Sequence, residues 1–238
     1  MKSPIHVIFF DAAETLFHVK GSVAEIYLTH AVQHGFRQTP DSQASITQAF
    51  QRAFRDAPPP VFSTTDPRRL KECERLWWFD LVHNVFYRVG MFERFDEFFE
   101  RVFQVFEDPR SWVLFPETHA VLTRLREEGF ELGILSNFDS RLFPVMRGLG
   151  IDGFFDTVTI ASLAKAAKPS SKIFEIALEK HALDPDEAMH VGDSVRDDLE
   201  GATKAGLTGV LIDRAGRSQA SKGHVIRTLE ELLPLVGF

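Results

Sequence analysis

The sequence contains a single cysteine, Cys73, among its 238 residues, so no disulfide can form within the chain. It has no apolar run that approaches the ~20 residues needed to span a membrane. The short apolar run from Ile5 to Phe10 ends at Asp11 and is too short for a signal peptide. We therefore expect a cytoplasmic protein.

The sequence also lacks an excess of basic residues. No stretch is rich in lysine and arginine, and the formal net charge is -7, from 27 basic and 34 acidic residues. Such a chain has no electrostatic footprint for nucleic acid, and its charge disfavours anionic membranes. We expect neither as a partner, and an anionic small molecule would have to be attracted by local positive charges.

The chain does contain short apolar runs that alternate with helical patterns. Five runs rich in β-forming residues predict buried parallel strands, at residues 6–10, 132–135, 157–160, 188–191 and 209–212. Apolar residues at helical spacing lie between them, at residues 117–128, 140–149, 170–181 and 199–205. This alternation of strand and helix predicts an α/β fold with a doubly wound parallel sheet.

The stretch between the first two of these strands breaks the alternation. It shows no convincing strand, and its patterns predict several helices with a joint at the three prolines 58–60. We therefore expect an all-helical domain, residues 17–112, inserted into an α/β core made of residues 1–16 and 113–238. An apolar seam spaced by three and four residues predicts packing inside the insert, with an aromatic substrate pocket as the alternative. The seam comprises Phe92, Phe95, Phe99, Val102 and Phe106.

Four polar signals lie at the ends of predicted strands or in the loops that follow, where open α/β sheets build their sites. Asp11 opens the first signal, Ser136–Asn137 forms the second, Lys168–Pro169 the third and Gly192–Asp198 the fourth. Each alone has an ordinary explanation, such as a helix cap, a turn or a solvated side chain. Their joint order is far more specific than any one of them.

The fourth signal is strongly acidic. Asp193, Asp197 and Asp198 lie within six residues and repel one another unless a cation neutralises them. Hard oxygen ligands of this kind suit Mg²⁺. The pattern therefore favours a magnesium site, with an acidic loop that binds no metal as the alternative.

Taken together, the four signals resemble those of the haloacid dehalogenase-like hydrolases, in the branch with a helical cap inserted after the first motif. The resemblance spans nearly the whole chain. It implies that Asp11 is a nucleophile that forms a covalent aspartyl intermediate on a small phosphorylated substrate. It further implies that Ser136 binds the transferring phosphoryl oxygens, that Lys168 neutralises charge beside them, and that Asn137 and Thr15 help to bind the substrate.

The same resemblance implies a set of ligands for Mg²⁺. Asp11 and Asp193 would ligate the ion together with the backbone carbonyl of Ala13. Asp198 or Asp197 would complete the shell, directly or through water. Positioning and charge neutralisation of this kind are what phosphoryl transfer needs most.

One position departs from the family pattern. Phosphatases of this family usually carry a second aspartate two residues after the nucleophile, which protonates the leaving group and then activates water. The present chain has Ala13 there. Loss of a positioned acid and base costs roughly 10²–10⁴ in rate. A phosphatase of this kind would need another acid, for which the adjacent Glu14 is a candidate, or a substrate with a good leaving group.

Three further interpretations stay open. A 2-haloacid dehalogenase needs no leaving-group acid, but relatives of that kind lack the Gly-Asp pair present at Gly192. A phosphonoacetaldehyde hydrolase has alanine at this position, but it requires a cap lysine for a Schiff base, and the insert offers only Lys20 and Lys71. The last alternative is a binding relative with little catalysis. The four retained signals favour a magnesium-dependent phosphatase.

Overall fold

A computed structural model describes residues 4–218 and 223–238. Its α/β core is a six-stranded sheet in the order β5-β4-β1-β6-β7-β8, and every neighbouring pair is parallel. The strands are β1 Val7–Phe10, β4 Glu131–Ser136, β5 Thr157–Ile160, β6 Ala188–Gly192, β7 Thr208–Ile212 and β8 His224–Ile226. The expected doubly wound parallel sheet is confirmed.

Helices cover both faces of this sheet, and the central strand shows why. All four residues of β1 are fully buried, with Ile8 and Phe10 in one apolar cluster and Val7 and Phe9 in another. Alternate side chains of a strand point to opposite faces, so β1 is apolar throughout because it is covered twice. The covering helices are α5 Thr118–Glu127, α6 Leu142–Gly148, α7 Ala161–Ala164, α8 Ser171–Glu179 and α9 Gly201–Lys204, with short 3-10 turns at Asp152–Phe154, Pro185–Glu187 and Leu229–Leu235.

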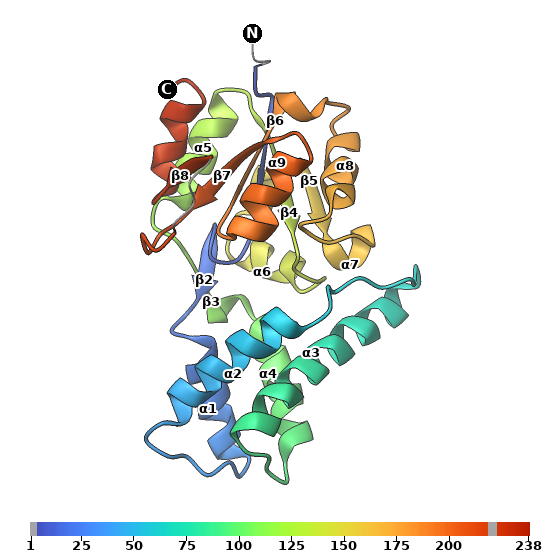
Figure 1. Ribbon diagram of the computed structural model, residues 1–238, viewed down its shortest axis with the longest axis vertical. Helices are drawn as coiled ribbons and strands as arrows, with labels where there is room; N and C mark the ends of the chain where they lie inside the picture. The colour runs from blue at the N-terminus through green and yellow to red at the C-terminus, as the bar shows by residue number, and fades with distance from the viewer. Residues whose placement is uncertain (1–3, 219–222) are drawn as a thin grey trace.

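A separate helical part lies beyond the carboxyl ends of the core strands (Figure 1). It consists of α1 Val23–Gln33, α2 Ser42–Asp56, α3 Pro67–Val89 and α4 Phe95–Glu107. Phe95, Phe99 and Val102 are buried in its apolar cluster, and Phe92 and Phe106 pack against it. The seam is therefore packing inside the helical part, as expected. Among the described residues, no helix is both long enough and apolar enough to cross a membrane.

Two short strands join the core to the helical part. β2 (Phe17–Val19) pairs antiparallel with β3 (Trp112–Leu114), which follows a 3-10 turn at Pro109–Ser111. The expectation of no strand between residues 17 and 112 was therefore wrong at both edges of that range. Three residues are too few to show an alternating pattern, and the two partners are far apart in the sequence.

Three local expectations also need correction. Ser140 does not start a helix, because α6 begins at Leu142 and the Ser140 hydroxyl donates instead to Glu74. The helix expected at residues 199–205 begins earlier, as a π-helix over Val195–Glu200. The strand β8 was not expected, because its three residues carry no apolar run.

Candidate functional site

The register of the sheet brings three of the four polar signals to one edge. Phe10 of β1 lies opposite Ile134 of β4 and Val191 of β6. Asp11 therefore leaves its strand beside the ends of both neighbours, and its N–H donates to the Val191 carbonyl at 2.9 Å. Ser136 ends β4 and Gly192 ends β6, so both follow at the same edge.

A chain of buried charges connects these strand ends. Lys168 Nζ lies 2.9 Å from Asp11 Oδ1 and 2.6 Å from Asp198 Oδ1. Burial alone would lower the pKa of Lys168, but the charges of Asp11 and Asp198 raise it above its ordinary value. Burial would likewise raise the pKa of Asp198, yet the Lys168 charge and a hydrogen bond from His190 hold it far below its usual range. Both groups are therefore charged at neutral pH.

Asp198 is held from three directions. Its Oδ1 accepts from His190 Nε2 at 2.8 Å as well as from Lys168, and its Oδ2 accepts from the Ser194 N–H at 2.9 Å. Space for this carboxylate depends on Gly192, where an added Cβ would lie 2.2 Å from Asp198 Cγ. Asp198 is thus held in place by His190 of β6, by the Ser194 backbone and by Lys168 from the loop after α7.

Asp193 has the opposite environment. Its carboxylate can approach those of Asp11 and Asp198 so that all three ligand oxygens lie within 4.8 Å of one another. Desolvation and the negative charges of Asp11 and Asp198 raise the pKa of Asp193 to about 8. A cation would remove that penalty, and three carboxylate oxygens are a fitting donor set for Mg²⁺.

The two other expected metal ligands are placed differently. Asp197 lies outside the three-carboxylate cluster, since the π-helix turns Asp198 inward while the Asp197 N–H bonds to Ser194 Oγ. Burial and the Asp198 charge raise the pKa of Asp197. Ala13 lies in the turn after β1, half-buried and bridged to Phe17, and a ligand role for its carbonyl stays a prediction.

The Ser136–Asn137 segment is tied to the Lys168 loop. The Asn137 side chain donates to the Lys168 carbonyl at 3.0 Å and accepts from the Lys168 N–H at 2.8 Å. This pair fixes the backbone from which the Lys168 side chain reaches Asp11. Ser136 is buried, and its hydroxyl accepts from the Phe138 N–H at 3.3 Å. The observed role of Asn137 is to position Lys168, and its expected contact with substrate stays a prediction.

Thr15 is the second residue that was expected to bind substrate. Its side chain is fully buried, and its hydroxyl has no hydrogen-bond partner among the described residues. Only its carbonyl is used, as the acceptor for Arg214 Nη2 at 2.7 Å. The side chain is enclosed in the turn between β1 and β2, and the substrate-binding role expected for it stays a prediction.

Glu14 is the acidic residue that follows Ala13, the position at which the second aspartate is missing. It has a left-handed backbone, with φ of 61°, and its N–H donates to the Phe17 carbonyl. Burial raises the pKa of Glu14, although His18 and Arg214 oppose the shift. The two lysines of the helical part, Lys20 and Lys71, are exposed, whereas a Schiff-base lysine needs desolvation to lower its pKa.

The sequence reasoning missed His190. It is fully buried on β6, and burial lowers its pKa, so the ring is neutral at pH 7. The neutral ring donates from Nε2 to Asp198, which leaves Nδ1 without a proton and, within residues 4–218 and 223–238, without a partner. One signal was available, since a histidine two residues before Gly192 interrupts an otherwise apolar strand.

Comparison with known proteins agrees with this geometry. A family model described as haloacid dehalogenase-like hydrolase matches residues 5–206. The mouse haloacid dehalogenase-like hydrolase domain-containing protein 3 is 29% identical over 238 residues, covering 97% of this chain and 93% of its own. A glyceraldehyde 3-phosphate phosphatase from Methanothermobacter thermautotrophicus is 33% identical over 112 residues, 47% of this chain and 49% of its own.

Solved structures show the same fold. A putative HAD-hydrolase from Bacillus subtilis, bound to magnesium, superposes with a TM-score of 0.73 at 19% identity, covering 99% of this chain and 100% of its own. The L-2-haloacid dehalogenase RSc1362 gives a TM-score of 0.74 at 21% identity and covers 99% and 100%. The family model covers most of the sequence. The chain therefore belongs to the haloacid dehalogenase-like hydrolases.

Proposed function

We propose that this protein is a Mg²⁺-dependent phosphatase that acts on a small phosphorylated metabolite through an aspartyl-phosphate at Asp11. One observation carries the proposal: Asp193 joins Asp11 and Asp198 in a cluster of three carboxylates, against which Lys168 sets a single positive charge. A dehalogenase has no use for such a cluster, because halide leaves without neutralisation by a metal. The same proposal makes residues 1–16 and 113–238 the catalytic core and residues 17–112 a cap over it.

Asp11, Asp193 and Asp198 would hold the metal, with the Ala13 carbonyl as a further ligand and Asp197 outside the shell. When bound, Mg²⁺ would neutralise the phosphoryl oxygens and the carboxylates around them. Lys168 supplies a fixed positive charge next to Asp11, at 2.9 Å. The substrate needs this local attraction because the protein as a whole is negatively charged.

In the reaction, a carboxylate oxygen of Asp11 forms a bond to phosphorus while the bond between phosphorus and the leaving oxygen breaks. Water then attacks the phosphorus of the aspartyl-phosphate, which releases inorganic phosphate and restores the carboxylate. Ser136, at the end of β4, would donate to a phosphoryl oxygen. Ala13 can neither protonate the leaving oxygen nor take a proton from water.

The missing acid and base make the rate depend steeply on the leaving group. Aryl and acyl phosphates should be hydrolysed far faster than sugar phosphates, since their leaving oxygens need little protonation. Slow attack by water should let the aspartyl-phosphate accumulate, so that the first turnover outruns the later ones. Glu14, with its raised pKa, is the candidate for a substitute acid and base. In that role it would weaken both the dependence on the leaving group and the burst.

The test is a panel of aryl, acyl and sugar phosphates, phosphonoacetaldehyde and 2-haloacids, each with Mg²⁺ and with a chelator. We expect chelator-sensitive release of phosphate, with a burst on an aryl phosphate and loss of turnover in Asp11→Asn. Halide release that resists the chelator would replace the proposal with a dehalogenase. No turnover of any compound would favour a binding relative. Equal rates on aryl and sugar phosphates without a burst would assign the acid and base to another group, tested next by Glu14→Gln.

A further inference from the structure

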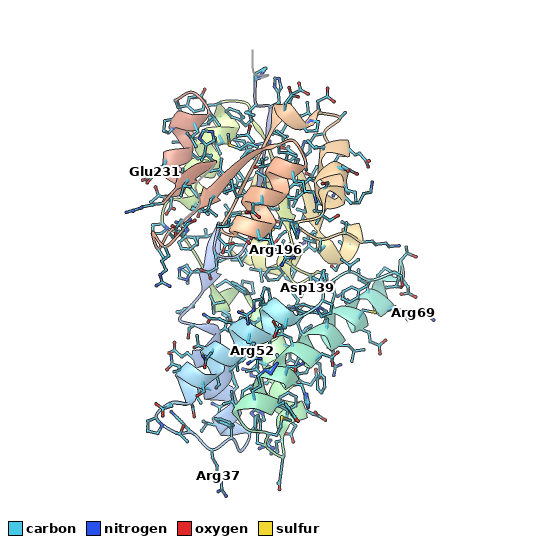
Figure 2. The ribbon with its side chains drawn as sticks, viewed as in Figure 1. Arg37, Arg52, Arg69, Asp139, Arg196 and Glu231 are labelled. Atoms are coloured by element: carbon cyan, nitrogen blue, oxygen red, sulfur yellow. The ribbon has the colours of Figure 1, made fainter. Side chains whose placement is uncertain are left out.

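A polar junction joins helix α3 of the helical part to the turn that follows Ser136–Asn137. We call it the α3 junction: it comprises Glu74 and Trp78 on α3, Phe103 on α4, and Asp139, Ser140 and Arg141 in the core. Figure 2 shows Asp139 at the boundary between the two parts. Glu74, Asp139 and Arg141 are all buried, with exposed fractions of 3%, 2% and 5%.

The core side of the junction is a buried ion pair. Arg141 donates from Nε to Asp139 Oδ1 at 2.9 Å and from Nη2 to Asp139 Oδ2 at 2.6 Å. Burial would raise the pKa of Asp139, but the Arg141 charge and these hydrogen bonds hold it below its ordinary value. The pair is therefore charged, and a buried charge must find its remaining partners nearby.

The helical part supplies those partners. Trp78 Nε1 donates to Asp139 Oδ2, and the Arg141 guanidinium lies 4.8 Å from the Trp78 ring centroid and 4.3 Å from that of Phe103. One helical turn before Trp78, Glu74 accepts from the Ser140 N–H at 3.1 Å and from the Ser140 hydroxyl. The N-cap residue of α6, Arg141, makes no side-chain capping bond. Glu74 instead binds Ser140, two residues before the helix begins, from outside the core.

The turn held in this way is continuous with the site. Only two residues lie between Ser136 and Asp139, and one of them, Asn137, fixes the Lys168 backbone through both of its amide atoms. A shift of this turn would move the Ser136 hydroxyl and the Asn137 clamp together. Misplacement by about 1 Å in such a site can cost 10²-fold in rate.

We infer that Glu74 and Trp78 are positioning residues for the Ser136–Asn137 loop, so that the phosphoryl-binding edge is completed by helix α3 and not by the core alone. The inference rests on the proposed function for its kinetic consequence, but the hold on the turn is a property of the protein itself. Neither side chain touches the reacting atoms, and both act through the 139–141 turn.

The sequence provides a matched control. Trp77 adjoins Trp78 on the same helix, but its Nε1 donates to the Pro58 carbonyl at 2.8 Å, inside the helical part. Trp77→Phe and Trp78→Phe therefore remove the same kind of donor from the same helix, and both keep an aromatic ring at the positions where the two tryptophans contact each other, with centroids 5.0 Å apart. We expect only the second variant to loosen the core turn. Glu74→Ala removes the second contact, and Glu74→Gln keeps one acceptor for Ser140.

Two measurements test the inference on the full chain: hydrogen exchange of the Ser140 and Arg141 amides, and kcat and KM on an aryl phosphate with Mg²⁺. We expect exchange about tenfold faster in Trp78→Phe and Glu74→Ala, in line with the loss of one or two buried hydrogen bonds. We expect kcat to fall about tenfold with KM changed less, partial recovery in Glu74→Gln, and Trp77→Phe within twofold of the wild type in both readouts.

Exchange in Trp78→Phe equal to that in Trp77→Phe would overturn the inference, whatever the kinetics. Faster exchange with unchanged kcat would also overturn it, because the turn would be loosened without effect on the loop. If Trp78→Phe loses its folded far-UV spectrum, Glu74→Gln decides by the same two criteria. An inactive wild-type chain would contradict the proposed function instead, and the exchange rates would still show whether α3 holds this turn.

Discussion

The core and the helical part both bury apolar side chains, but only the core also buries a cluster of charged ones. The core encloses Asp11, Lys168, Asp198 and His190 at the ends of its central strands. Among the described residues of α1–α4, Glu74 is the only buried acidic or basic side chain, and the interior is dominated by aromatic rings such as Phe86 and Phe98, whose centroids lie 4.9 Å apart.

This difference separates the part of the molecule that carries the candidate reactive groups from the part that is held together by apolar packing. Ions buried at strand ends cost free energy of desolvation, and they persist where a reaction uses them or where partners satisfy them. Apolar rings stabilise without specifying a reaction. The exception is informative, because Glu74, the one buried acidic side chain in the described residues of α1–α4, binds the Ser140 backbone and hydroxyl of the core. Four substitutions test this separation, from the largest expected effect to the smallest.

Asp11→Asn should lower kcat by about 10⁴-fold or more, since an amide is not a competent nucleophile. The fold should persist, because the amide has nearly the same shape and Asp198 remains as a partner for Lys168 at 2.6 Å. Steady-state rates on an aryl phosphate measure the loss of kcat, and a thermal melt shows whether the fold persists. Turnover within tenfold of the wild type would rule out the covalent mechanism.

Phe98→Ala should destabilise the protein by about 3–5 kcal/mol, as expected for a fully buried aromatic ring replaced by alanine. The ring lies among Tyr27, Phe86 and Phe92 in the helical part. Urea unfolding measures the loss, with Tyr87→Ala as control because Tyr87 is 74% exposed. Equal losses in the two variants would contradict the assignment of this cluster as the source of stability.

Asp139→Asn should cost about 1.5–3 kcal/mol at pH 7, the usual worth of hydrogen bonds to a charged group. The pKa of Asp139 is lower in the folded protein than its ordinary value of 3.8. The stability that the ionised Asp139 contributes to the folded protein is therefore fully present above about pH 4 and is lost as the pH falls through the folded-state pKa. The difference from wild type in urea unfolding should shrink below pH 4, and a difference constant from pH 7 to pH 3 would refute this assignment.

Gly192→Ala should destabilise by about 1–3 kcal/mol, because its Cβ would overlap the Asp198 carboxylate. The displaced carboxylate would also loosen Lys168, so kcat should fall more than stability alone explains. Gly153→Ala is the control, since nothing lies within 4 Å of a Cβ added there. Unchanged kcat in Gly192→Ala would mean that Asp198 is not needed in this place.

Local patterns in the sequence were enough to predict the first five core strands and the four signals at their ends. They could not predict the β2–β3 ribbon or the contact of Glu74 with Ser140, because each depends on residues far apart in the chain. The choice between Asp197 and Asp198 was open for a related reason. The helix expected there began only at Leu199, whereas the structure has a π-helix over Val195–Glu200 that turns Asp198 inward.

The placement of β1 at the centre of the sheet has a consequence during synthesis. β1 carries the nucleophile at its end, yet its neighbours in the sheet begin only at Glu131 and Ala188. At about 5–20 residues per second, the ribosome needs roughly 6–25 s to make the chain between β1 and β4. For that interval four large apolar side chains, Val7 to Phe10, have no sheet to join. The helical part is synthesised after β1 and before β4, so we expect the nascent strand to depend on chaperones until β4 is made.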